Sequence, residues 1–160
     1  MELKQILGIL IIAVLFTIVG FYLALMSITE FNNSGLQHTK LAPYPVINES
    51  QITLTDNSIC IEIPNAEIGR YAATGSMKPT LDENSIGIRI KITNESQVHI
   101  GDIVSYQHEN DTIIHRVIGI SQDPNGIYFT MKGDNNLMSI SYENKVRFKD
   151  LKYLTVGMLW

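Results

Sequence analysis

The sequence predicts a mainly β protein, with an antiparallel β-sheet domain that follows one apolar segment at the N-terminus. Beyond residue 50, short runs alternate apolar and polar side chains with the two-residue period of a strand that buries one face. Turn-forming residues separate these runs at close intervals, and no long amphipathic helical pattern lies among them. Strands are predicted at 52–54, 59–63, 86–92, 103–106, 112–120, 127–131 and 153–158, with turns at 82–84, 99–102, 109–111, 123–126 and 133–136.

The apolar segment predicts an uncleaved transmembrane helix. No charged side chain occurs from Gln5 to Thr29, and 6–26 is almost continuously aliphatic or aromatic. As a helix that rises about 1.5 Å per residue, this run covers roughly 30 Å, the thickness of a bilayer's hydrocarbon core. A cleavable signal peptide would have a shorter core ending in small residues, which 22–27 does not offer. A buried helix of a soluble protein is the remaining alternative.

Three parts are predicted along the chain: a cytoplasmic stub and transmembrane anchor at 1–27, a linker at 28–50, and a β-rich domain at 51–160. The linker is rich in Asn, Ser, Gly and Pro, and either holds the domain away from a membrane or packs along it. Lys4 precedes the apolar run and Lys40 is the first basic residue after it, which favours a cytoplasmic N-terminus. The β domain is therefore expected on the extracytoplasmic side of a cell or endoplasmic reticulum membrane.

Charge and cysteine content argue against several classes of protein. The net charge is −4 and the basic residues are scattered, so nucleic-acid binding is not expected. Cys60 is the only cysteine, which excludes an internal disulfide and a zinc site built on several thiolates. His38, His99 and His108 lack the paired spacing of metal ligands, so no metal or cofactor is expected.

A candidate nucleophile, Ser76, lies in the Gly- and Pro-containing segment from Thr74 to Asp82, directly after a predicted strand. A serine hydroxyl needs a base within hydrogen-bonding reach and donors for a developing oxyanion. The hydroxyl of Thr74, two residues earlier, is a candidate to hold an oxyanion together with the Ser76 amide. A bond within its own turn is the equal alternative for Thr74.

The candidate base is His115, on the predicted strand 112–120. Strand alternation places it on one face with Ile113 and Val117, and Arg116 on the other face. Apolar surroundings disfavour the imidazolium, lower the histidine pKa and keep the ring able to accept a proton. A structural histidine with satisfied hydrogen bonds is the alternative for this position taken alone.

A candidate acid, Asp134, lies in the Gly-Asp-Asn-Asn turn that follows the strand 127–131. Turn chemistry alone explains an Asp there, because its side chain can bond nearby backbone. Beside a neutral histidine, the same carboxylate would fix the tautomer and stabilise the imidazolium.

Segments 75–81, 101–104, 115–118 and 132–136 resemble, in order and spacing, the conserved boxes of type I signal peptidases. A histidine before Arg-Val, where bacterial members carry lysine, is similar to the archaeal and endoplasmic reticulum branch. The resemblance implies that Ser76 is the nucleophile, His115 the general base and Asp134 the associated acid. It also implies cleavage of signal peptides after A-x-A-type sites, with preproteins and the lipid bilayer as partners, and with substrate bound as an added strand.

The chain departs from that branch after the Gly-Asp-Asn-Asn turn. The branch generally carries a second aspartate a few residues on, but 137–142 contains no acid and Glu143 is the first carboxylate. Either Glu143 substitutes from a shifted loop, or the second acid is dispensable, or activity is impaired. The resemblance predicts that Asp134→Ala is more damaging than Glu143→Ala.

Two other classes of function stay open. One is a non-catalytic, membrane-anchored β module that binds preproteins or assembles with a translocon or accessory subunit. The other is a self-cleaving repressor-type protease, which would use a lysine base and a DNA-binding segment where this chain has its apolar run. The C-terminal run 154–160 is too short for a second membrane span.

Overall fold

The computed structural model describes residues 14–22 and 40–160. Residues 14–22 form a helix, and Lys40–Trp160 form one compact β domain. Among the helices in these two ranges, none is both long and apolar enough to cross a membrane. The predicted anchor at 1–27 lies mostly outside the described residues, so the transmembrane helix stays a prediction.

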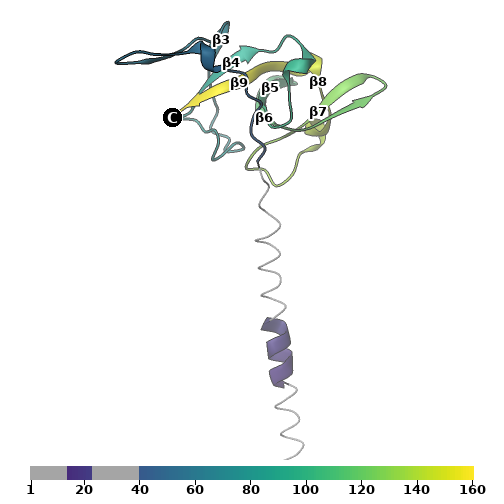
Figure 1. Cartoon of the computed structure of the whole chain (residues 1–160). Helices are drawn as coiled ribbons and strands as arrows, with labels where there is room; N and C mark the ends of the chain where they lie inside the picture. Colours follow the sequence, from purple (N-terminus) through teal and green to yellow (C-terminus); the bar gives the residue numbers. More distant parts are fainter. Residues whose placement is uncertain (1–13, 23–39) are drawn as a thin grey trace, which may run out of the picture. The chain divides into compact units, whose positions relative to one another are not determined.

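The β domain is built from antiparallel strands, as the sequence predicts (Figure 1). Seven strands form the main sheet in the order β3-β4-β9-β5-β6-β7-β8, and β1 and β2 pair separately. The strands are β1 (Ile52–Leu54), β2 (Ile59–Ile61), β3 (Ala66–Arg70), β4 (Ile86–Lys91), β5 (Ile103–His108), β6 (Asp111–Asp123), β7 (Gly126–Lys132), β8 (Val146–Arg147) and β9 (Leu151–Leu159). The described residues also form four short 3-10 helices, of which η1 (Glu49–Gln51) precedes β1 and the others lie between strands: η2 (Glu95–Gln97), η3 (Ser141–Lys145) and η4 (Phe148–Asp150).

The pairing of β5 with β6 explains how neighbouring residues of β5 pack into two different apolar clusters. Val104 lies opposite His115, and Ile103 lies opposite Arg116. Because opposite residues point to the same side, His115 and Arg116 face different sides of the sheet. The main cluster includes Val104, and a smaller cluster joins Ile103 to two residues of the Ser76 loop, Met77 and Leu81.

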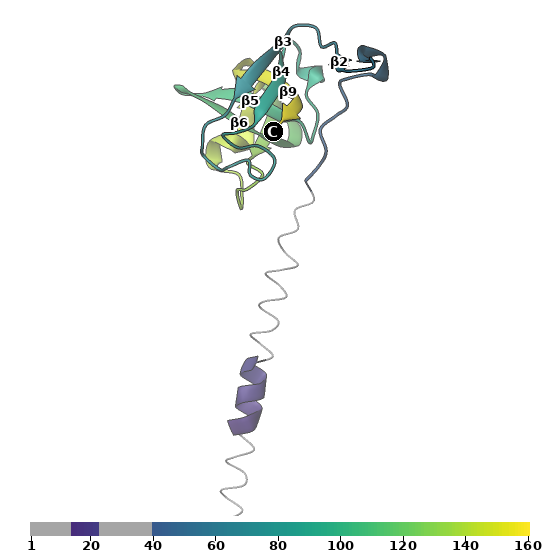
Figure 2. The ribbon, with the colours of Figure 1, turned by 90° about the vertical axis from the view of Figure 1, so that its left-hand side faces the viewer.

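The β1–β2 hairpin departs from the prediction that each alternating run buries one face. Every residue of both strands is exposed, with Leu54 at 72% and Ile59 at 68%. The two strands pair only with each other and project from the main sheet (Figure 2). Period-two alternation indicates a strand, but burial of its apolar face depends on another element that packs against it.

The start of the β domain lies along the strands rather than away from them. The Tyr44 amide donates to the buried Asp102 carboxylate at 2.7 Å, and Arg116 donates to the Leu41 carbonyl at 3.0 Å. Of the two alternatives for the predicted linker, these contacts support packing along the domain for its residues from Lys40 onward.

Candidate active site

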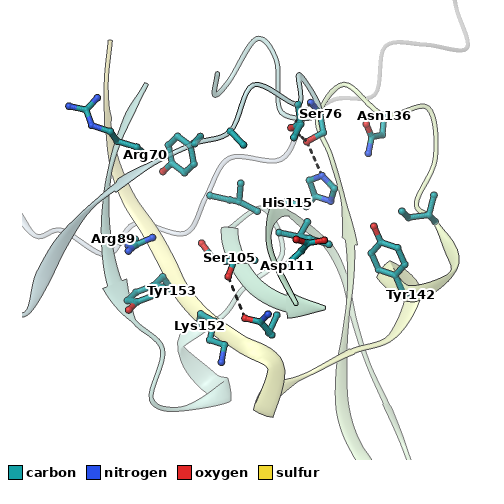
Figure 3. Close-up of a pocket in the computed structure, with 18 residues that line it drawn as sticks. Arg70, Ser76, Arg89, Ser105, Asp111, His115, Asn136, Tyr142, Lys152 and Tyr153 are labelled. Carbon is teal, nitrogen blue, oxygen red and sulfur yellow. Dashed lines mark hydrogen bonds between the residues drawn. The ribbon is translucent and has the colours of Figure 1, made fainter. Parts of the chain in front are cut away.

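Ser76 lies in the loop between β3 and β4, and the loop is anchored on both sides of the hydroxyl. Met77 and Leu81 are 3% and 2% exposed and pack with Ile103. Gly75 has a φ of +72°, a left-handed conformation that glycine adopts without a Cβ clash. Met77 and Leu81 anchor the loop after Ser76, and Gly75 allows the chain to turn before it. The Ser76 side chain then points toward a cleft that it lines (Figure 3).

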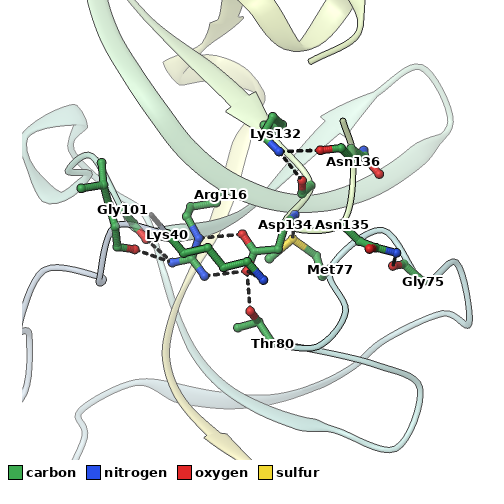
Figure 4. A network of polar contacts seen from close by, with 12 residues as sticks. Lys40, Gly75, Met77, Thr80, Gly101, Arg116, Lys132, Asp134, Asn135 and Asn136 are labelled. Atoms are coloured by element: carbon green, nitrogen blue, oxygen red, sulfur yellow. Dashed lines mark hydrogen bonds and ion pairs between the residues drawn. The ribbon is translucent and has the colours of Figure 1, made fainter. Parts of the chain in front are cut away.

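The Gly-Asp-Asn-Asn turn after β7 holds the Ser76 loop by its backbone. Asn135 donates from its amide to the Ser76 carbonyl at 2.8 Å. Its side chain donates to the Gly75 carbonyl at 3.1 Å (Figure 4). A Cβ at Gly133 would lie 2.7 Å from the Ser76 carbonyl oxygen, so only glycine fits this close approach. The turn therefore positions the serine, a role that its residue types alone do not indicate.

His115, from β6, meets the candidate nucleophile directly. Its Nε2 lies 3.1 Å from Ser76 Oγ, within hydrogen-bonding distance (Figure 3). The His115 residue is 5% exposed. The two residues are 39 positions apart in the chain and are brought together by the loop and the strand that carry them.

Glu143, in η3, holds the other nitrogen of the same ring. Its Oε1 accepts a hydrogen bond from His115 Nδ1, and its side chain is fully buried. The Tyr106 hydroxyl donates to Oε1 at 3.3 Å, and the Ile140 amide donates to Oε2 at 2.9 Å. A carboxylate at Nδ1 fixes the proton there, so Nε2 keeps the lone pair that accepts from Ser76.

The electrostatics of the ring favour a neutral base. Burial is the largest effect and lowers the pKa of His115 below its ordinary value. The carboxylates of Glu143 and Asp134 act in the opposite direction because they favour the imidazolium, and Lys132 acts with burial. The net result agrees with the expectation of a histidine that is uncharged at neutral pH.

Asp134 does not lie against His115, which corrects the predicted pairing. Its carboxylate accepts two hydrogen bonds from Arg116, at 2.8 and 2.7 Å, and a third from the Thr80 hydroxyl (Figure 4). Burial alone would raise the pKa of Asp134, but the bonds from Arg116 and Thr80 bring it below its ordinary value. Strand alternation is the reason: Arg116 and His115 point to opposite faces, and the turn that carries Asp134 lies on the Arg116 face.

The Arg116–Asp134 pair is expected to stabilise the fold. The two side chains are 7% and 3% exposed, and Arg116 also donates to the Gly101 carbonyl at 2.7 Å. Asp134→Ala leaves a buried guanidinium without its carboxylate, so we expect a loss of about 3–5 kcal/mol in the free energy of unfolding, measured by denaturant titration. Lys40→Ala is the control, because Lys40 is 37% exposed and 3.9 Å away, and its loss should cost only about 0–1 kcal/mol. Equal effects of the two changes would contradict this role.

The position of Thr74 is compatible with both of its predicted roles, a contact to an oxyanion and a hydrogen bond within its own turn. Its hydroxyl oxygen is 3.2 Å from Ser76 Oγ, and the Ser76 amide points at it from 3.5 Å. The hydroxyl and the amide are therefore both adjacent to the nucleophile.

Sequence reasoning missed two members of the site, Tyr106 and the Ile140 amide. Tyr106 is on β5 near His115, with the two rings 6.5 Å apart. Its contact with Glu143 depends on the β5–β6 register and on the path of the loop before η3, and neither leaves a local signal in the sequence. Burial and the nearby Glu143 carboxylate raise the Tyr106 pKa, which keeps the phenol protonated as a donor.

The cleft beside Ser76 and His115 has a volume of about 860 Å³. Its lining includes the segment after β3 and residues 111–115 of β6, together with residues of β4, β5, β9 and the loop before η3. Residues 111–115 of β6 pair only with β5, since the pairing with β7 begins at Arg116. Within residues 40–160, the second edge of 111–115 thus has no partner strand, and an extended peptide could add there.

The sequence is similar to that of a known peptidase. Signal peptidase I W from Bacillus subtilis (strain 168) is 31% identical to this chain over 64 residues. The alignment covers 39% of this chain and 34% of that protein, so the chain spans about a third of the length of the relative it matches. No protein-family model matches the sequence. The similarity supports a relationship to signal peptidase I and a serine peptidase kind of activity.

Proposed function

We propose that this protein is a membrane-bound serine endopeptidase that removes N-terminal signal peptides from secreted preproteins. Ser76 is the nucleophile, His115 the general base, and Glu143 the carboxylate that orients the base. The observation that carries the proposal is the chain of contacts from Ser76 Oγ to His115 Nε2, at 3.1 Å, and from His115 Nδ1 to the buried Glu143. A histidine as the base supports assignment to the archaeal and endoplasmic reticulum branch, and Glu143 would then be the acid, supplied by a shifted loop.

The contacts support the following order of proton transfers. His115 Nε2 takes the Ser76 proton as the oxygen attacks the scissile carbonyl, and the imidazolium that forms is stabilised by Glu143. The tetrahedral oxyanion is held by the Ser76 amide and the Thr74 hydroxyl. His115 then returns the proton to the leaving amine, and a second cycle with water releases the acyl group from Ser76.

The unpaired edge of β6 suits a substrate of varied sequence. A signal-peptide segment that adds as a strand gains main-chain hydrogen bonds regardless of its side chains, while pockets for alternate residues select small ones. The substrate is tethered to the bilayer by its own apolar segment, so an anchor in this chain would keep both molecules on the extracytoplasmic surface.

The proposal is tested with the full-length protein in liposomes and a preprotein that carries an A-x-A site. We expect cleavage after the second small residue, identified from the masses of the two products. A matched preprotein with bulky residues at both small positions is the control and should be cut far more slowly. Binding of both preproteins without cleavage of either would support the non-catalytic module and overturn the peptidase.

The pH dependence of cleavage follows from the neutral base. Because the folded-state pKa of His115 lies below the ordinary value of about 6.5, the base is unprotonated above that pH. We expect kcat/KM to be nearly constant at neutral pH and to fall only as the pH drops below about 6.5. A pH series of initial rates measures this, and a half-maximal rate above pH 7 would contradict it.

A further inference from the structure

The end of the cleft away from Ser76 is positively charged, although the chain as a whole carries a net charge of −4. Arg70, Arg89 and Lys152 line this end, and Figure 3 shows Arg70, Arg89 and Lys152 on the side remote from Ser76 and His115. Asp111 is the acidic lining residue, and it is exposed. Within residues 40–160, neither Arg70 nor Lys152 forms an ion pair, so their charge is available to a ligand.

The position of Arg89 is fixed by its neighbours, but its positive charge is not fully neutralised by a carboxylate. Its guanidinium lies 4.1 Å above the Tyr153 ring, and a Cβ at Gly69 would be 3.2 Å from it, so Gly69 leaves room for the side chain. Its carboxylate contact is Glu67, which is half exposed and 3.4 Å away, longer than a strong charge-assisted hydrogen bond. Within the described ranges the buried Nε of Arg89 has no hydrogen-bonding partner.

Two buried hydroxyls beside Arg89 are also unpartnered. The hydroxyl of Tyr71, a cleft residue, and that of Thr155 form no hydrogen bond of normal geometry with residues 14–22 or 40–160. Burial raises the Tyr71 pKa, while a hydrogen-bonding contact with the Thr155 side chain and the charge of Arg89 act in the opposite direction, so the two hydroxyls are near enough to interact with each other. Buried polar atoms without partners are uncommon in folded proteins, and a group of donors around a guanidinium matches an anionic oxygen ligand.

We propose that this end of the cleft is a subsite for an acidic side chain of the substrate. It would accept an Asp or Glu carboxylate, with Arg89 as the main contact and Arg70 and Lys152 as supporting charges. A substrate strand paired along residues 111–115 of β6 extends about 13 Å along the cleft, starting at His115. The acidic residue of the substrate would therefore lie roughly four to six positions from the cleaved bond. The inference rests on the proposed peptidase function and adds a preference for acidic substrates to it.

The test is a series of preproteins that differ only by Asp or Asn at each position from four to six residues on either side of the cleaved bond. We expect kcat/KM to favour Asp over Asn by about tenfold at one of these positions, and the ratio to fall with added salt. Arg89→Gln is expected to bring that ratio to about one. Lys149→Gln removes an exposed charge outside the cleft and should keep the tenfold ratio.

Further arms keep the test decisive. Arg70→Gln and Lys152→Gln, at exposed positions, should each reduce the ratio in part, so the result does not depend on one variant that must fold. If the Asp and Asn preproteins are cleaved with nearly equal kcat/KM at every position, the subsite is overturned but the peptidase function is not. Failure to cleave any preprotein with an A-x-A site would instead overturn the peptidase function. A tenfold ratio that survives in Arg89→Gln would assign the preference elsewhere.

Discussion

Ser76→Ala is expected to abolish cleavage of an A-x-A preprotein while leaving the fold intact. Removal of the nucleophile prevents formation of the acyl intermediate, so kcat should fall by at least about 10³-fold. Among residues 14–22 and 40–160, the side-chain oxygen forms hydrogen bonds only with Thr74 and His115, whereas the anchoring bond from Asn135 uses the Ser76 carbonyl. The variant should therefore unfold at nearly the same temperature as the unmodified protein.

The measurement is the initial rate of product formation, with thermal unfolding recorded on the same preparations. Ser96→Ala is the matched control, because Ser96 is exposed in η2 and lies outside the cleft. Cleavage by Ser76→Ala at a rate close to that of Ser96→Ala would show that another group attacks the peptide bond.

Glu143→Gln is expected to lower kcat by about 10²–10⁴-fold, more than Asp134→Asn does, which reverses the ranking that the family resemblance suggested. A carboxylate at His115 Nδ1 fixes the reactive tautomer. In serine proteases, loss of the carboxylate that orients the histidine lowers kcat by a large factor. Asp134 contacts Arg116 instead, so its replacement should lower the stability of the fold more than it lowers kcat.

Two measurements distinguish a role of Glu143 in orienting His115 from a role only in stabilising the fold. Glu143→Asp retains the charge but is one methylene shorter, and a displacement of about 1 Å from the ring should itself cost about 10²-fold. Because the Glu143 carboxylate raises the His115 pKa, Glu143→Gln should move the acidic limb of the pH profile to lower pH. An unchanged profile with a full loss of stability would show that Glu143 is only structural.

The strands were predictable because their signal is local. Alternation of apolar and polar residues marks β4, β5, β6, β7 and β9 wherever one face packs on a cluster, and the antiparallel arrangement is confirmed. The strand predicted before the serine turn, β3, and the two-residue β8 are too short for alternation to define their range. The hairpin β1–β2 carries the pattern, yet no described element covers it.

The candidate site was predictable in part for the same reason. Ser76 in a turn and His115 on a strand face are properties of short segments, and the structure brings their side chains within hydrogen-bonding distance. The identity of the acid depends on which loop reaches the His115 face, and the chain offers two carboxylates, Asp134 and Glu143, within ten residues of each other.

The sequence by itself determined most of the strands, the turn that carries the serine and the face of β6 that carries the histidine, because each follows from side-chain alternation and turn chemistry over a few residues. Only the tertiary structure decided that Asp134 pairs with Arg116, that Glu143 and Tyr106 meet at His115 Nδ1, and that three cations share one cleft. These contacts join residues from separate strands and loops, so they depend on sheet order, register and loop path, which no short segment encodes.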